Sequence, residues 1–135
     1  MGFLKPMLAA VLLSLHLPAA AAGEFSISFE WGYLQRCNDG IPNRVKNPRF
    51  VLTNVPAGTE SIEFEMVDLD NSDYYHGGGT VVYSGHDVVA PGAFTYNSPC
   101  PRRGSHTFQW TAVARSAGSS SKLLGNARAS RSYPE

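Results

Sequence analysis

Residues 61–68 read Ser-Ile-Glu-Phe-Glu-Met-Val-Asp and form the clearest two-residue alternation in the chain. Ile62, Phe64 and Met66 share one side, and two glutamates share the other. Successive side chains of a β-strand point to opposite faces, so the pattern predicts a strand with one buried face. By the same period Asp68 falls on the apolar side, where a carboxylate is either a cap for a neighbouring loop or part of a binding site.

A second stretch, residues 106–114, alternates in the same way. Its predicted inward row begins with His106 and continues through Phe108 and Trp110. His106 therefore mirrors Asp68, because each is a polar group at the end of an apolar strand face.

Several shorter segments also have strand character, and turn residues separate them. They are Phe25–Trp31, Arg49–Thr53, Thr80–Tyr83, Phe94–Tyr96 and Leu123–Tyr133. Residues 36–48 carry turn chemistry and are predicted to be loop, and His86 is expected in a solvated turn. Since no segment has a convincing helical period, we expect a mainly β fold, a sandwich or small barrel of about seven to nine short strands.

The first 22 residues have the features of a secretory signal peptide. Lys5 supplies the positive start, Met7–Leu17 the apolar run and Ala19–Ala22 the small-residue cleavage region. Cleavage after Ala22 would leave 113 of the 135 residues, 23–135, as a single β domain. The apolar run is shorter than the roughly 20 residues of a membrane-spanning helix, and no later segment reaches that length. We therefore expect a secreted or periplasmic protein without a membrane span.

The charge balance argues against nucleic acid as a partner. The chain has 11 basic and 11 acidic residues, so it lacks the basic surplus that phosphate backbones attract. The pair Arg102-Arg103 is interpreted as a solvated loop tip.

The two cysteines, Cys37 and Cys100, are predicted to form a disulfide, because export places them in an oxidising compartment. Such a bridge closes a long loop and contributes about 4 kcal/mol on the chain-entropy model. The alternative is a free buried thiol and a free exposed one.

Two polar blocks are candidates for a binding site, His76-Gly77-Gly78-Gly79 and Tyr96–His106. The glycines, Gly77 and Gly78 in particular, would let backbone amides approach a ligand. The same run matches the oxyanion loop of some α/β-hydrolases, but the chain has no G-x-S-x-G motif and too few residues for that fold. A serine esterase is therefore not expected.

Asp68, His76 and His106 could in principle form a two-histidine, one-carboxylate metal site. No His-x-His or His-x-x-x-His spacing supports it, so we expect neither a metal nor a cofactor. Recognition of a small anion remains, through backbone N–H groups and histidine donors. The alternative is that the glycines form a β-bulge and both histidines bond buried carbonyls. The residues alone leave both possibilities open.

The order of the blocks resembles the phosphatidylethanolamine-binding protein (PEBP) family, in its bacterial Raf-kinase-inhibitor-like branch. The resemblance covers roughly residues 25–133 and rests on residues 54–61, Asp68-Leu69-Asp70, His76, Tyr96–Pro101 and Gly104-Ser105-His106. These resemble the family's V-P-x-G-T-x-S turn, its D-P-D-A-P strand end, the histidine of its H-W-type strand and its G-P-x-P-x-G-x-H block. Leu69 replaces the first proline of D-P-D-A-P, and three glycines follow His76 where the family usually has tryptophan and aliphatic residues.

The resemblance implies a PEBP-like β-sandwich or Greek-key fold with an anion pocket. It places Asp68, His76 and His106 in the pocket, with Ser98, Pro99 and Pro101 shaping the rim. The expected ligand is a phosphate, a phospholipid headgroup or a carboxylate, and no catalytic residue is expected. One alternative is a protein-interaction module that inhibits an exported enzyme, working through the loops around Tyr74-Tyr75 and Arg102. A metal-dependent or hydrolytic enzyme is the less favoured alternative.

Overall fold

The computed structural model describes residues 1–3, 15 and 23–135. The predicted signal peptide therefore lies almost wholly outside the described residues. The described part is all β and contains nine strands. They are β1 (Ser26–Glu30), β2 (Arg44–Lys46), β3 (Arg49–Thr53), β4 (Ser61–Asp68), β5 (Tyr75–Val82), β6 (Val88–Val89), β7 (Thr95–Asn97), β8 (His106–Arg115) and β9 (Leu123–Tyr133). Within the described ranges there is no helix with the length and hydropathy needed to cross a membrane.

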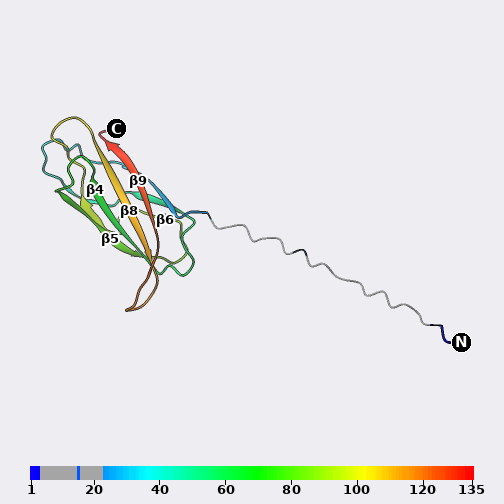
Figure 1. The fold of residues 1–135 in the computed structure, drawn as a ribbon. Coiled ribbons are helices and arrows are strands. Elements are labelled where there is room, and N and C mark those ends of the chain that lie inside the picture. Colours follow the sequence, from blue (N-terminus) through cyan, green and yellow to red (C-terminus); the bar gives the residue numbers. More distant parts are fainter. Residues whose placement is uncertain (4–14, 16–22) are drawn as a thin grey trace.

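The strands form three antiparallel sheets (Figure 1). The largest has the order β5-β4-β8-β9, so β4 and β8 are neighbours although 37 residues lie between Asp68 and His106 in the chain. The second sheet has the order β1-β3-β6, and β2 pairs with β7 in a small third sheet. Asp68 pairs with Phe108 in the β4–β8 register, which brings the end of β4 to the start of β8.

The core lies between the first two sheets and is mostly aromatic. Phe50 of β3 is fully buried and stacks on Phe64 of β4, with ring centroids 4.4 Å apart. Trp110 of β8 meets Phe50 edge to face at 5.2 Å. Apolar burial of this kind contributes about 25 cal/mol per Å² and holds the two sheets face to face.

A buried amide organises the loop that precedes β7. Asn47 is 1% exposed, and its Nδ2 donates to the carbonyls of Pro48 and Ala90. Its Oδ1 accepts hydrogen bonds from the backbone N–H groups of Gly92 and Phe94, each at 3.0 Å. All the hydrogen-bonding capacity of this side chain is therefore used to fix Phe94 over the core.

Strand boundaries agree closely with the sequence pattern where alternation is long. β4 and β9 match their predicted ranges, and β8 extends the predicted one by a single residue. Two short strands, β2 and β6, were not predicted, and β2 lies inside the segment expected to be loop. β5 begins at Tyr75 rather than Thr80, so the predicted start was wrong and the three glycines are strand residues.

Candidate functional site

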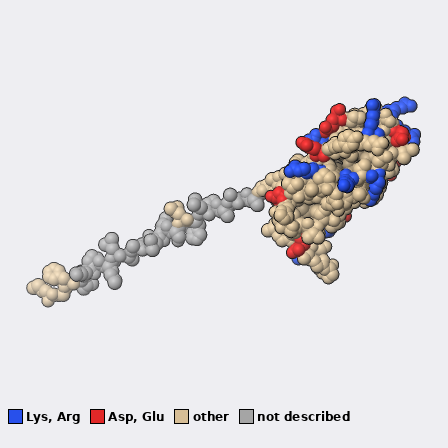
Figure 2. Space-filling model, turned by 180° about the vertical axis from the view of Figure 1, so that it is seen from behind, with Lys and Arg blue, Asp and Glu red and all other residues tan. Residues whose placement is uncertain are grey.

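A cavity of about 540 Å³ opens at the end of the large sheet where β4 ends and β8 begins. It is lined by Gly40, Pro42, Asp68, Asn71, Tyr74, His76, Cys100, Pro101, Arg102, Arg103 and His106. We call Asp68, His76 and His106 the floor, because they are the buried or half-buried polar groups of the lining. We call Pro101, Arg102 and Arg103 the rim. Figure 2 shows that charged side chains of both signs gather toward the upper end of the domain, which is also the end where β9 terminates in Figure 1.

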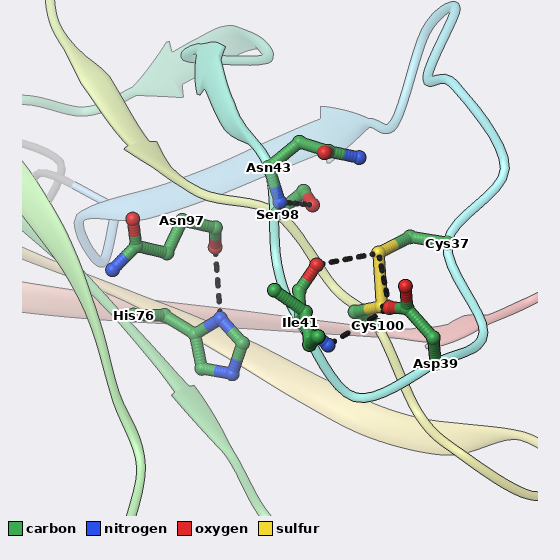
Figure 3. Close-up of a disulfide and its surroundings, with 8 residues drawn as sticks. All are labelled: Cys37, Asp39, Ile41, Asn43, His76, Asn97, Ser98 and Cys100. Atoms are coloured by element: carbon green, nitrogen blue, oxygen red, sulfur yellow. Dashed lines mark hydrogen bonds between the residues drawn. A yellow bond between two sulfur atoms is a disulfide. The ribbon is translucent and has the colours of Figure 1, made fainter.

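The rim is held against the preceding loop by a disulfide between Cys37 and Cys100 (Figure 3). Both cysteines are buried, and the bridge spans 63 residues of sequence. The loop wraps the sulfurs closely, since the Ile41 carbonyl lies 3.3 Å from Sγ of Cys37 and Oδ1 of Asp39 lies 3.3 Å from Sγ of Cys100. The predicted disulfide is therefore present, and it fixes residue 100 directly before the rim.

Hydrogen bonds to the backbone also join the segment before the rim to the loop around residue 43, on the side of the floor. Ser98 is 1% exposed, its Oγ accepts from the Asn43 N–H at 3.0 Å, and its own N–H donates to the Asn43 carbonyl at 2.8 Å. Pro99 is also fully buried. These two residues support the cavity from behind and do not line it.

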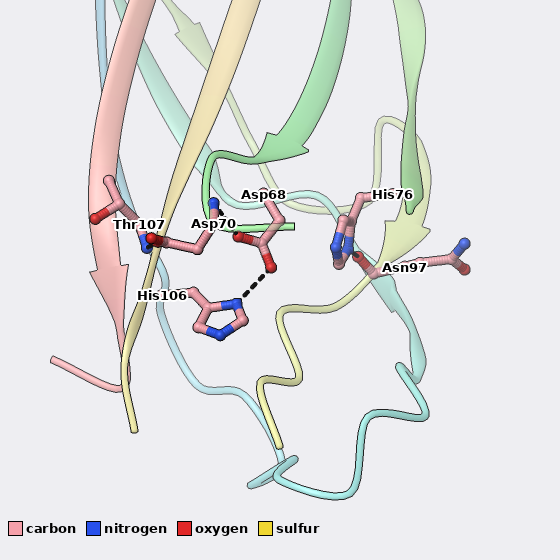
Figure 4. Close-up of polar contacts among 6 residues, drawn as sticks. All are labelled: Asp68, Asp70, His76, Asn97, His106 and Thr107. Atoms are coloured by element: carbon pink, nitrogen blue, oxygen red, sulfur yellow. Dashed lines mark hydrogen bonds and ion pairs between the residues drawn. The ribbon is translucent and has the colours of Figure 1, made fainter. Parts of the chain in front are cut away.

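Asp68 and His106 form a hydrogen-bonded pair at the floor (Figure 4). Nδ1 of His106 lies 2.7 Å from Oδ2 of Asp68, and Oδ1 of Asp68 accepts from the Asp70 N–H at 2.9 Å. Asp70 in turn accepts from the Thr107 N–H at 2.7 Å. The loop after β4 is thus bonded to the first residues of β8, which holds Asp68 beneath the cavity.

A β-bulge turns His76 inward. The β4–β5 register shifts between Glu65 and Val67, so that His76 and Gly77 together oppose the single residue Met66. Gly77 has φ +85°, a conformation that glycine adopts without strain, and bulges redirect side chains in this way. His76 is 3% exposed as a result.

Hydrogen bonding and aromatic contacts fix the His76 ring. Nδ1 lies 2.8 Å from the carbonyl oxygen of Asn97, and because a carbonyl only accepts, this nitrogen carries the hydrogen (Figures 3 and 4). Tyr74 and Phe108 meet the ring edge to face, at 4.6 and 5.4 Å. Burial lowers the pKa of His76 below 6.5 despite the opposing effects of the Asn97 carbonyl and Asp68. The ring is therefore neutral at neutral pH.

The structure brings Asp68, His76, Pro101 and His106 together around one cavity. Gly77 and Gly78, predicted to offer backbone amides, are not among its lining residues. Packing accounts for Gly78, because a Cβ there would lie 1.8 Å from the carbonyl oxygen of Phe64. His86 is exposed in a turn, as expected.

Sequence reasoning missed part of the lining. Arg102 and Arg103 are exposed, as a loop tip should be, but they also line the cavity. Gly40, Pro42, Asn71 and Tyr74 were not singled out as pocket residues either. The predicted disulfide was the sequence feature that could have indicated these lining residues, because it joins the loop before Gly40 to the segment before Arg102.

Among the described residues, one group of potential metal-ligand atoms lies within 4.8 Å of one another: Cys37, Asp39 and Cys100. Both sulfurs are bonded to each other, so neither supplies the thiolate that metal binding requires. The floor trio is not such a group.

Comparison with known proteins identifies the fold. No protein-family model matches the chain, and no curated protein matches its sequence significantly. Among solved structures, the chain is similar to a phosphatidylethanolamine-binding protein homologue, CT736, from Chlamydia trachomatis. The match has a TM-score of 0.56 at 12% identity and covers 83% of this chain and 98% of the other.

The chain therefore has a PEBP-like β fold, as its sequence blocks predicted. At this identity the similarity concerns the fold alone. The narrower resemblance to the bacterial Raf-kinase-inhibitor-like branch stays a prediction.

Proposed function

We propose that this protein binds a small anion, of phosphate or carboxylate type, in the cavity formed by the floor and the rim. The observation that carries the proposal is the convergence of two exposed arginines, Arg102 and Arg103, with three buried or half-buried polar groups on one cavity. Arginine offers several N–H donors in a planar fork that matches carboxylate and phosphate oxygens. A cavity of about 540 Å³ is of the size that small ligands occupy.

We further propose that the protein is exported. Two features support this: the Lys5 and Met7–Leu17 pattern at the start of the sequence, and the disulfide between Cys37 and Cys100. Disulfides persist in oxidising compartments and are rare in reducing ones.

We propose a binding role rather than a catalytic one. Asp68 and His106 resemble two members of a hydrolase triad, but the nucleophile side is not assembled among the described residues near them. Ser98 is buried and accepts from Asn43, Ser105 donates to the Pro134 carbonyl, and the two cysteines are oxidised. A serine or cysteine nucleophile needs a base within hydrogen-bond reach.

A second candidate function is a protein-interaction module that inhibits an exported enzyme. Tyr75 is 67% exposed and Tyr74, at 38%, borders the cavity. Exposed tyrosines are enriched at protein interfaces. Recovery of a stoichiometric partner from the exported fraction by the wild type, and its loss with Tyr75→Ala, would favour this function over ligand binding.

The experiment that tests anion binding is a thermal-shift screen of the purified protein. The panel contains phosphate, phosphoethanolamine, nucleotides and small carboxylates. The variants are Arg102→Gln/Arg103→Gln and the charge-matched control Lys122→Gln/Arg128→Gln, whose two residues are exposed and do not line the cavity. A ligand at about 100 times its dissociation constant adds about 2.7 kcal/mol, which is several degrees for a domain of this size. We expect the shift in the wild type and the control, and its loss in the rim variant. No shift with any anion would overturn the proposal.

A further inference from the structure

The hydrogen-bonding roles of the floor residues define what kind of anion they accept. Nδ1 of His76 donates to the Asn97 carbonyl, so the single hydrogen of the neutral ring is already used. Its Nε2 then presents a lone pair, and Figure 3 shows this nitrogen on the side of the ring away from Asn97. Since His76 lines the cavity, this nitrogen is the acceptor that the ring can offer to a ligand there.

The other two floor residues are hydrogen-bonded to each other. The Asp68 carboxylate has no hydrogen to give, and its oxygens accept from His106 and from the Asp70 N–H. The cationic donors of the cavity, Arg102 and Arg103, lie at the rim.

We propose that the cavity selects oxyanions that carry their own hydrogen, such as monohydrogen phosphate, over fully deprotonated oxyanions of the same shape and charge, such as sulfate. The inference rests on the proposed anion-binding function. The P–O–H group of the bound anion donates to Nε2 of His76, and its charged oxygens face the arginines. A sulfate oxygen in the same position would face the Nε2 lone pair with no hydrogen between them. Nε2 would then lack a hydrogen-bond donor and would be repelled by the sulfate oxygen.

The charged and titratable groups around His76 give this selectivity a pH dependence. The ring faces Asp68 at the end of β4, His106 at the start of β8 and Tyr74 before β5, and Arg44 of β2 lies near the adjoining Gly77. Protonation of His76 places a hydrogen on Nε2 and converts that acceptor to a donor. Sulfate binding therefore requires His76 to take up a proton, so it strengthens in acid. Monohydrogen phosphate carries its own hydrogen, so its binding needs no proton uptake by His76.

The test is a calorimetric titration of the purified protein with phosphate and, separately, with sulfate, at mildly alkaline pH and at constant ionic strength. Both anions are then mainly divalent and tetrahedral, and only phosphate carries a hydrogen. We expect phosphate to bind at least about tenfold more tightly than sulfate. Lowering the pH should bring the sulfate affinity toward that of phosphate.

His76→Phe keeps an aromatic ring between Tyr74 and Phe108 and removes the Nε2 acceptor. We expect the phosphate to sulfate ratio to fall to about one in this variant, with a cooperative unfolding transition retained. The pH series needs only the wild type, so it tests the inference even where the variant folds poorly.

The outcomes separate the two proposals. Equal affinity for both anions in the wild type at mildly alkaline pH overturns the selectivity and leaves the anion-binding function intact. A ratio that persists in His76→Phe also overturns it, because the discrimination then lies elsewhere. Binding of neither anion, nor of any other anion in the screen, overturns both.

Discussion

Nδ1 of His106 lies 2.7 Å from Oδ2 of Asp68, and the two residues belong to strands that are neighbours in the sheet but distant in the sequence. The pair forms because Asp68 sits opposite Phe108 in the β4–β8 register, which leaves His106 one step beyond on the same inward row. Asp68 is 4% exposed, so its carboxylate oxygens depend on this ring and on the Asp70 N–H for hydrogen bonds. The contact joins the floor of the cavity to the core of the sheet.

Replacement of Asp68 by Asn tests what this pair contributes. The substitution keeps the shape but removes one acceptor oxygen and the charge, so either His106 or the Asp70 N–H loses its bond. We expect a loss of about 1–3 kcal/mol in the free energy of unfolding, measured with denaturant. Asp73→Asn, at an exposed position of the same loop, should stay within about 0.5 kcal/mol of wild type. Equal stability of the two variants would show that the pair does not stabilise the fold.

The disulfide should contribute to both stability and ligand affinity. Replacing Cys37 and Cys100 together by serine removes the constraint on a 63-residue loop, and we expect a loss of about 4 kcal/mol. The rim arginines follow Cys100 directly, so anion affinity should fall in the same variant. Chemical reduction of the wild type is the matched control and should give the same two losses. If reduction leaves both quantities unchanged, the bridge does not hold the rim.

Stability should decrease in acid because of His76. Burial lowers its pKa in the folded protein below the value of 6.5 that it has in the unfolded chain. At a pH between the folded and the unfolded pKa, the unfolded chain therefore binds a proton that the folded protein does not. The contribution of neutral His76 to the free energy of unfolding is complete above about pH 6.5. It is lost as the pH falls from there through the lowered pKa of the folded protein. The measurement is the free energy of unfolding of wild type and His76→Phe against pH. The difference between them should shrink in acid. A pH-independent difference for His76→Phe would contradict the assignment.

Close packing of β5 predicts that Gly78 accepts no side chain. A Cβ at this position would meet the Phe64 carbonyl at 1.8 Å and the Glu65 Cα at 2.9 Å, both of them backbone atoms that cannot rotate away. Gly78→Ala should therefore cost more than about 2 kcal/mol in stability. Thr80→Ala, at an exposed position of the same strand, is the control and should cost much less. A stable Gly78→Ala protein would mean that the β4–β5 pairing differs from the one described.

Much of this fold could be predicted from the sequence because β4 and β8 alternate over long stretches. The alternation located both strands, their buried faces and the polar groups Asp68 and His106 at their ends. β2 and β6 were missed because two or three residues carry too little periodicity. The start of β5 was missed because glycine has low strand propensity, so only the pairing with β4 reveals that these residues are extended.

The candidate site was predictable only in part, for a related reason. Side chains that end a strand face can be found from the pattern, but two determinants of the cavity depend on long-range contacts. Arg102 and Arg103 reach it because the disulfide fixes the preceding residue. His76 presents Nε2 because its Nδ1 bonds the backbone carbonyl of Asn97, and a backbone acceptor leaves no mark in the sequence.

The most direct test of the account is the imidazole nitrogen spectrum of the protein, recorded by NMR during a phosphate titration. The histidines provide their own control, since His76 and His106 line the cavity and His86 is exposed in the turn that follows β5. We predict that the resonances of His76 and His106 shift together and saturate at one common affinity, while those of His86 stay unchanged. Saturable binding that leaves both cavity histidines unshifted, or no saturable change at all, would contradict the claim that this cavity binds a small anion.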